Sequence, residues 1–131
     1  MKILIIEAIS DKIFLVIIKN KNIYTSRYKN SKSNFDKLTV LIRRFLDKYN
    51  ISFSQLSEIY VNRGPGSFAG TRSSLSTVQG LHLAKKIDYF CYSYKDFKDV
   101  KDEKNIKWFQ LPKLCRKYKI KKNLIKPLYM S

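Results

Sequence analysis

The chain has 131 residues, of which 44% are hydrophobic and 14% aromatic, so it is long enough to bury one core and lacks the composition of a disordered chain. No apolar run approaches the ~20 residues of a membrane span, and we expect no membrane contact. The net charge of +17 suits a polyanionic partner such as tRNA. Coding bias explains it equally well, because the excess of lysine over arginine (21 to 6) and the 15 isoleucines are typical of an AT-rich genome.

The N-terminal residues predict a three-stranded meander. Residues 2–9 are nearly all apolar, which is typical of a strand buried on both faces. The polar pair Ser10-Asp11 separates them from a second strand at 12–19, and Asn20-Lys21-Asn22 offers a turn before a third strand at about 23–28. An acid follows only four apolar residues at the N-terminus, so this segment does not resemble a secretory signal, and we expect a cytoplasmic protein.

Residues 33–50 predict an amphipathic helix. Ser33 or Asn34 is suited to the N-cap, Asp36 to the first turn, and Asn50 to the C-terminal stop. Apolar side chains recur every three or four residues and form one core-facing stripe: Phe35, Leu38, Ile42, Phe45, Leu46 and Tyr49. A fourth strand follows at about 58–62.

The loop after this strand is rich in glycine and is followed by another helix. It reads Arg63-Gly64-Pro65-Gly66-Ser67-Phe68-Ala69-Gly70-Thr71-Arg72 and holds three of the four glycines. Glycine permits positive φ and close backbone approach, and the N–H groups at a helix start favour anions. The candidate phosphate or anion ligands are Arg63, Gly64, Gly66, Ser67 and Gly70. The loop is neither a Walker loop nor a dinucleotide fingerprint, and its chemistry leaves open an anion site or a structural turn.

The helix expected at about 70–87 has two distinct faces. At ~100° per residue, Leu75, Val78 and His82 share one side, and we expect His82 to be packed or in an interface rather than to act as a base. The opposite side is a stripe of small residues that is either covered within the monomer or available to a partner helix. Gly80 costs roughly 1 kcal/mol relative to alanine in a helix interior, so we expect close packing there. The candidate partner-interface residues are Arg72, Ser73, Thr77, Gly80 and Ala84.

The C-terminal part is predicted to be basic and less regular. A fifth strand is expected at about 88–93, and a short helix is expected to begin near Pro112. Residues 113–126 hold seven positive charges and no acid, a cluster suited to RNA or an acidic partner. The RNA candidates are Lys117, Lys119, Lys121 and Lys122. Because Cys91, Cys115 and a single histidine do not make a usual zinc site, we expect buried thiols, no metal and no catalytic residue.

Three segments carry a family resemblance. The segment Asn62–Arg72 resembles the hallmark G-R-G-P-G-S-F-T-G-x-R of the bacterial TsaB (YeaZ-like) family, with Ala69 in place of threonine. The opening Ile3-Leu4-Ile5-Ile6-Glu7-Ala8 is similar to the family's I-L-A-I-D-T, with a glutamate in place of aspartate. The ending Lys126-Pro127-Leu128-Tyr129-Met130 is similar to P-x-Y-L-R.

The resemblance implies an α/β fold, the first lobe of the actin-like ATPase (ribonuclease H-like) superfamily. We expect a mixed five-stranded sheet, an antiparallel meander followed by parallel strands, with helices packed on it. Residues 1–93 are expected to form this lobe, and residues 94–131 a reduced basic remnant packed on the same domain. Family members are usually longer and have two lobes, so most of the second lobe is expected to be missing.

The resemblance also implies a role in tRNA processing without catalysis or cofactors. Family members pair with the catalytic paralogue TsaD, which transfers threonylcarbamoyl to the adenosine beside the tRNA anticodon, and with the ATPase TsaE. We expect a scaffold or activator that forms a heterodimer with TsaD, contacts tRNA indirectly or through the basic cluster, and is able to form a homodimer when alone. The alternatives are a phosphate- or nucleotide-binding lobe with enzymatic activity and a stand-alone basic RNA-binding module.

Overall fold

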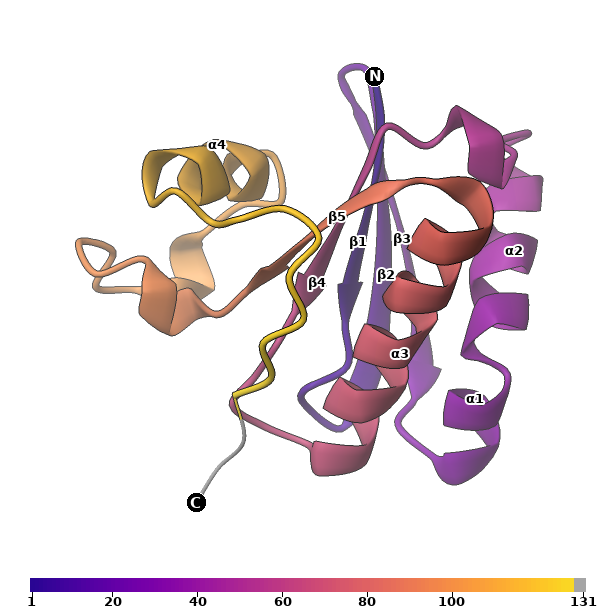
Figure 1. Ribbon diagram of the computed structural model, residues 1–131, viewed down its shortest axis with the longest axis horizontal. Helices are drawn as coiled ribbons and strands as arrows, with labels where there is room; N and C mark the ends of the chain where they lie inside the picture. The colour runs from indigo at the N-terminus through magenta and orange to yellow at the C-terminus, as the bar shows by residue number, and fades with distance from the viewer. Residues whose placement is uncertain (129–131) are drawn as a thin grey trace.

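The computed structural model describes residues 1–128, which form a mixed five-stranded sheet with helices on both faces (Figure 1). The strands are β1 (Lys2–Glu7), β2 (Lys12–Lys19), β3 (Asn22–Lys29), β4 (Glu58–Asn62) and β5 (Asp88–Tyr92), in the spatial order β3-β2-β1-β4-β5. The first three strands are an antiparallel meander, and β4 pairs in parallel with both β1 and β5. The predicted α/β fold class and sheet pattern are therefore confirmed.

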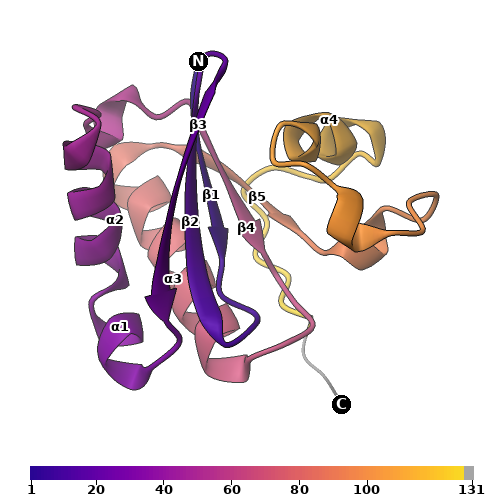
Figure 2. The same cartoon turned by 180° about the vertical axis from the view of Figure 1, so that it is seen from behind.

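The helices are divided between the two faces of the sheet. The helices α1 (Lys32–Asp36), α2 (Leu38–Lys48) and α3 (Phe68–Lys85) cover one face, and α4 (Gln110–Lys117) lies on the other (Figures 1 and 2). Short 3-10 turns at Phe53–Gln55, Tyr94–Asp96 and Glu103–Asn105 connect these elements. Within residues 1–128, no helix is long and apolar enough to cross a membrane.

Strand β1 lies between two apolar clusters because its side chains alternate between the faces of the sheet. Leu4 and Ile6 belong to the cluster beneath α2 and α3, whereas Ile3 and Ile5 belong to the cluster beneath α4. This double burial explains why residues 3–6 are all apolar. The segment around α4 is thus packed on the same sheet as the helices of the opposite layer.

The predicted single helix at 33–50 is wrong in one respect, because the structure breaks it at Lys37. This residue has φ −117° and ψ 26°, so α1 ends at Asp36 and α2 begins at Leu38. The N-cap is Ser31, whose side chain accepts a hydrogen bond from the Asn34 N–H, and neither Ser33 nor Asn34 fills that role. Asn50, with φ +57°, follows α2 in the left-handed conformation that commonly ends helices.

The apolar stripe of this segment is confirmed along α2. The buried side chains of α2 are Leu38, Leu41, Ile42, Phe45 and Leu46. Phe35 and Tyr49 are half-buried against the same cluster, at the two ends of the stripe. Burial of large aliphatic side chains is worth about 1.5–3 kcal/mol each, so this stripe is what holds α2 on the sheet.

The last described residues form an irregular segment, 119–128, which we call the C-terminal strap. It runs from the end of α4 across the outer side of β5 towards the start of α3 (Figure 1). Lys122 forms an isolated bridge with Phe90, and the N–H of Asn123 donates to the carbonyl of Tyr89 at 2.7 Å. Tyr129 and Met130 of the predicted terminal motif lie outside the described residues.

Candidate functional site

The glycine-rich loop is a tight corner between β4 and α3. Gly64 has φ +109°, and a Cβ at this position would overlap the carbonyl oxygen of Leu128 in the C-terminal strap. A Cβ at Gly66 would overlap the Ile9 carbonyl, and one at Gly70 the Ala8 carbonyl. Each glycine is therefore explained by the close approach of another backbone segment of the same chain.

The polar groups of this loop are largely engaged with the protein itself. The N–H of Gly64 donates to Asn62 Oδ1 at 2.9 Å, and the N–H of Ser67 donates to the carbonyl of Ile9 at 2.9 Å. Ser67 is the N-cap of α3, and its side chain accepts from the Gly70 N–H at 3.1 Å. An anion at this loop would have to displace these contacts, so the geometry favours a structural corner.

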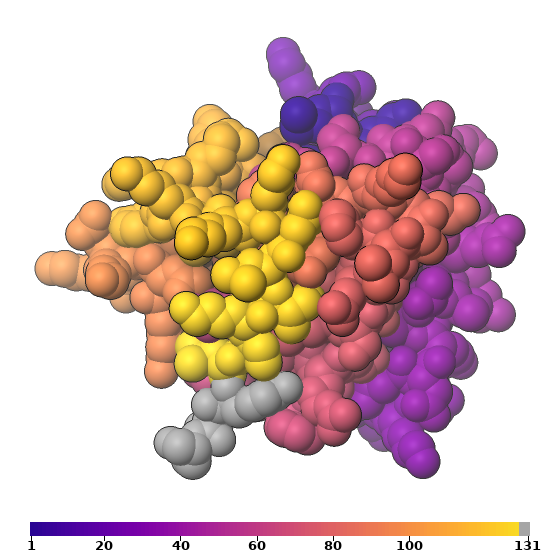
Figure 3. Space-filling view, in the orientation of Figure 1, coloured from indigo at the N-terminus to yellow at the C-terminus, as the bar shows by residue number. Residues whose placement is uncertain are grey.

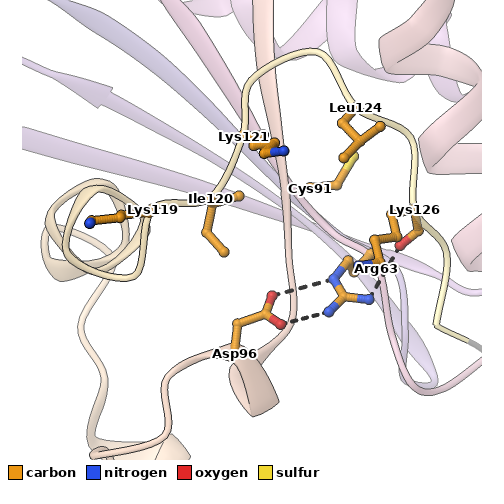
Figure 4. A pocket seen from close by; sticks show the side chains of 8 residues that line it. All are labelled: Arg63, Cys91, Asp96, Lys119, Ile120, Lys121, Leu124 and Lys126. Carbon is orange, nitrogen blue, oxygen red and sulfur yellow. Dashed lines mark hydrogen bonds and ion pairs between the residues drawn. The ribbon is translucent and has the colours of Figure 1, made fainter.

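Arg63 is also engaged, with its side chain 12% exposed. Its Nη2 donates to Asp96 Oδ1 at 2.6 Å, its Nε donates to Asp96 Oδ2 at 3.3 Å, and its Nη1 donates to the Lys126 carbonyl at 3.3 Å (Figure 4). A bidentate guanidinium–carboxylate pair is geometrically specific and strong. Arg63 therefore links the corner to the 3-10 turn at Asp96 and to the C-terminal strap.

A second polar cluster lies at the carboxyl ends of β1, β4 and β5. The Oε2 of Glu7 accepts three hydrogen bonds: from Tyr92 OH at 2.5 Å, Tyr94 OH at 2.6 Å and Asn62 Nδ2 at 3.0 Å. Burial and the negative charge of Glu7 raise the pKa of both tyrosines, so the phenols stay protonated and donate. Sequence reasoning singled out Glu7 but missed its three donors. Within residues 1–128, no group of three or more His, Cys, Asp or Glu residues is arranged to hold a metal ion.

The outer side of α3 forms a groove with α1 and α2. The upper hollow, of about 450 Å³, is lined by Thr39, Phe53, Ser76, Thr77, Gly80, Leu81, Ala84 and Lys85. The lower hollow, of about 380 Å³, is lined by Lys32, Phe35, Asp36, Phe68, Ala69, Arg72, Ser73 and Ser76. The five predicted interface residues thus all line one continuous surface, in which Ser76 belongs to both hollows. We call this surface the α3 groove.

The α3 groove is covered by the monomer only in part. The Ser73 hydroxyl donates to the carbonyl of Phe35 at 3.1 Å and so ties α3 to α1. Farther along, the close packing expected at Gly80 is not found, because no heavy atom of residues 1–128, apart from its chain neighbours and the backbone of its own helix, lies within 4 Å of a Cβ built there. Leu75 and Val78 on the opposite side of the helix are buried against the sheet, so this is the face that α3 packs on its own domain. Within residues 1–128, Gly80 is therefore open to a neighbour from another molecule.

Large apolar side chains are exposed on α3 and α2, and one of them, Phe68, lines the α3 groove. Leu83 is 76% exposed, Phe68 is 56% exposed, and Val40 on α2 is 45% exposed. Arg72 stacks over the Phe68 ring, with its Cζ 5.3 Å from the ring centroid. Exposed leucine and phenylalanine beside a groove of small residues are typical of a protein-binding surface.

The remaining candidates are the basic cluster, the histidine and the two cysteines. Lys117, Lys119, Lys121 and Lys122 are all exposed at the end of α4 and on the C-terminal strap, away from the α3 groove. His82 is half-buried, with Nδ1 2.9 Å from the Ile87 carbonyl and its ring against Tyr89. Cys91 and Cys115 are buried free thiols, as predicted, and burial raises their pKa to about 11 and about 12.

Comparison with known families identifies relatives in tRNA modification. The model of the family described as TsaD, tRNA N6-adenosine threonylcarbamoyltransferase, matches residues 23–91, just over half of the chain. Two tRNA threonylcarbamoyladenosine biosynthesis proteins TsaB, from Buchnera aphidicola subsp. Schizaphis graminum and subsp. Baizongia pistaciae, are each 31% identical. The matches cover 67% and 47% of this chain but 42% and 32% of those proteins. The chain therefore matches less than half the length of either relative.

Solved structures support the fold. YeaZ from Pseudomonas aeruginosa superimposes with a TM-score of 0.65 at 22% identity, over 70% of this chain and 43% of that one. RuvC from T. thermophilus, in complex with a Holliday junction substrate, gives a TM-score of 0.54 at 11% identity, over 76% of this chain and 68% of that one. At these identities the similarity concerns the fold alone.

Proposed function

We propose that this chain, which belongs to the family described as TsaD, tRNA N6-adenosine threonylcarbamoyltransferase, and is 31% identical to two TsaB proteins, is a partner subunit in threonylcarbamoyladenosine biosynthesis. In this role it acts as a scaffold or activator that forms a heterodimer with the catalytic TsaD subunit. TsaD would carry out the transfer to tRNA in the cytoplasm, and this chain would contribute no catalytic group.

The α3 groove is the observation that carries this proposal. It combines a glycine open to solvent at Gly80, small neighbours at Thr77 and Ala84, and exposed apolar side chains at Leu83 and Phe68. The 18-residue helix α3 is about 27 Å long, and a second helix beside it makes a platform roughly 20 Å wide. This area is of the same order as the ~800 Å² that each partner buries in a standard interface.

The polar clusters support a non-catalytic role. The Glu7 carboxylate is held by two phenols and an amide, and Arg63 is held by Asp96. These hydrogen bonds and this ion pair connect strands and loops of the fold, and a substrate that used either group would have to compete with them. Their contacts favour a rigid support for α3 over a nucleotide site.

Co-elution with the partner tests the proposal. The full chain and the TsaD protein of the same organism are mixed at 5 µM each and separated by size-exclusion chromatography coupled to light scattering. We expect one peak with the mass of a 1:1 complex, or of a dimer of such complexes. Separate elution of the two proteins, each shown to be folded by circular dichroism, would contradict the proposal.

Two further partners follow from the same role. With TsaD absent, the exposed apolar side chains of the α3 groove are expected to support a homodimer, which sedimentation at rising protein concentration measures. The ATPase TsaE is the second candidate, and mixing it with the chain alone and then with the chain–TsaD complex shows which of the two it binds. A chain that stays monomeric at every concentration would refute the self-association.

A further inference from the structure

The end of α4 and the C-terminal strap carry exposed cations that take almost no part in holding the fold together. Residues 113–126 contain seven lysine and arginine residues and no acid, and all seven side chains are exposed. Within the described chain, a single one of them forms an ion pair, between Lys122 and Asp88 at 3.8 Å, and both members of that pair are largely solvated. An exposed pair at this distance contributes little to stability.

The contacts that fix the C-terminal strap use its backbone and Asn123 instead. Asn123 exchanges two hydrogen bonds with the backbone of Tyr89, at 2.7 and 2.9 Å, and its Nδ2 donates to Asp88 Oδ1 at 2.9 Å. Farther along, Arg63 binds the Lys126 carbonyl, and the N–H of Leu128 donates to the Arg63 carbonyl at 2.8 Å. The lysine side chains are therefore mounted on a fixed backbone and remain available to a ligand.

The C-terminal strap lies on the molecular surface (Figure 3) and borders a hollow of about 250 Å³ between α4 and the outer side of β5 (Figure 4). Asp96 is the acidic residue that lines this hollow, and its charge is neutralised by the ion pair with Arg63, which also lines the hollow. Lys121 and Lys126 line the hollow, and the side chain of Lys119 points away from the ion pair (Figure 4). The cations thus surround a concave surface whose own negative charge is already compensated.

We propose that this surface, the end of α4 with the C-terminal strap, binds the phosphate backbone of RNA. Lys117, Lys119, Lys121 and Lys122 supply the charge, and the contact is electrostatic and independent of base sequence. The choice of RNA among the polyanions rests on the proposed function. The observation of an exposed basic surface does not depend on that function. The surface is separate from the α3 groove, so one molecule can hold a protein partner and RNA at once.

The rest of the chain provides an internal comparison. Residues 98–107 contain four lysines as well, but they are interleaved with Asp99, Asp102 and Glu103. The electric fields of these opposite charges largely cancel at a bound ligand, whereas the fields of the positive charges on the C-terminal strap add. If the overall charge of +17 caused RNA binding, the lysines of the two segments would contribute equally. If the C-terminal strap is a binding site, its lysines would contribute more.

The test measures binding of an unmodified tRNA transcript to the full chain, by fluorescence anisotropy between 50 and 300 mM KCl. One variant replaces Lys117, Lys119, Lys121 and Lys122 by glutamine, and the matched control replaces Lys98, Lys101, Lys104 and Lys107 by glutamine. We expect the slope of log K against log salt to fall by roughly 3 in the first variant and by less than 1 in the control. At 100 mM salt the first variant should lose at least about tenfold in affinity, with unchanged circular dichroism.

Two results would overturn the proposal. Equal losses in both variants would assign binding to overall charge, and equally tight binding of polyglutamate would assign the surface to an acidic protein. Because the experiment uses the chain without TsaD, a failure here leaves the co-elution test unaffected, and a failure of co-elution leaves this result intact.

Discussion

Gly80 provides the sharpest test of the α3 groove. In the monomer, replacing Gly80 by leucine removes the helix penalty of glycine, about 0.8–1 kcal/mol, and adds a side chain where no heavy atom of the described residues outside the adjoining helix backbone lies within 4 Å. The isolated variant should therefore be at least as stable as the parent, with a melting temperature higher by roughly 3–5 °C. Thermal unfolding followed by circular dichroism measures this.

The same substitution should weaken the complex. A partner helix that packs against a small-residue stripe approaches closely, and extra methylenes in a packed contact cost about 1–3 kcal/mol, a loss of roughly 5- to 150-fold in affinity. Titration of labelled chain with TsaD gives the affinity, and Gly80→Ala should lie between the parent and Gly80→Leu. The control is Lys113→Leu, an exposed position of α4 on the opposite face of the sheet.

Two outcomes would refute this reasoning. If Gly80→Leu binds TsaD as tightly as the parent, the partner does not contact this part of α3. If the variant instead unfolds at a lower temperature, Gly80 is packed within the monomer, and the α3 groove is not open there.

Three further predictions concern the interior. The buried hydroxyl of Thr71 has no hydrogen-bond partner among residues 1–128, so Thr71→Val should raise the free energy of unfolding by about 1 kcal/mol in urea titrations, and a decrease would reveal a missing partner. Tyr92→Phe removes a donor from the Glu7 carboxylate and should lower the same quantity by about 2 kcal/mol, whereas an unchanged value would show that the remaining donors suffice. Cys91 and Cys115 have pKa values raised from 9.0 to about 11 and about 12, so the unfolded chain ionises first as pH rises. Their stabilising contribution is complete below pH 9 and is lost towards pH 11–12, by about 1 kcal/mol per thiol at pH 10, and Cys91→Ala should flatten this decline relative to the parent.

The strands and α2 were predictable because local patterns determine them. The all-apolar run of β1 and the 3–4 spacing of α2 follow directly from which faces are buried. The break at Lys37 was not predictable, because lysine is compatible with a helix and only the backbone angles reveal the interruption. The N-cap of α1 was not predictable either, because Ser31, Ser33 and Asn34 are all of residue types suited to that position. The structure places Ser31 there.

The polar clusters were beyond sequence reasoning because their members are far apart in the chain. The donors to Glu7 lie 55, 85 and 87 residues away, and no local spacing connects them. The glycine loop was recognisable as a special backbone, but the groups that approach it, the carbonyls of Ala8, Ile9 and Leu128, come from other segments. The small-residue face of α3 was predictable from the sequence. The extent to which the α3 groove is exposed was not.

The C-terminal strap also matters for solubility. The last strand of a sheet presents unpaired N–H and C=O groups that invite another chain to add to it. On β5, Asn123 occupies both backbone groups of Tyr89, and Lys122 bridges to Phe90, so strand addition on this side requires the strap to detach first. A chain cut before residue 119 would lose this cover and leave the outer edge of β5 open to strand addition.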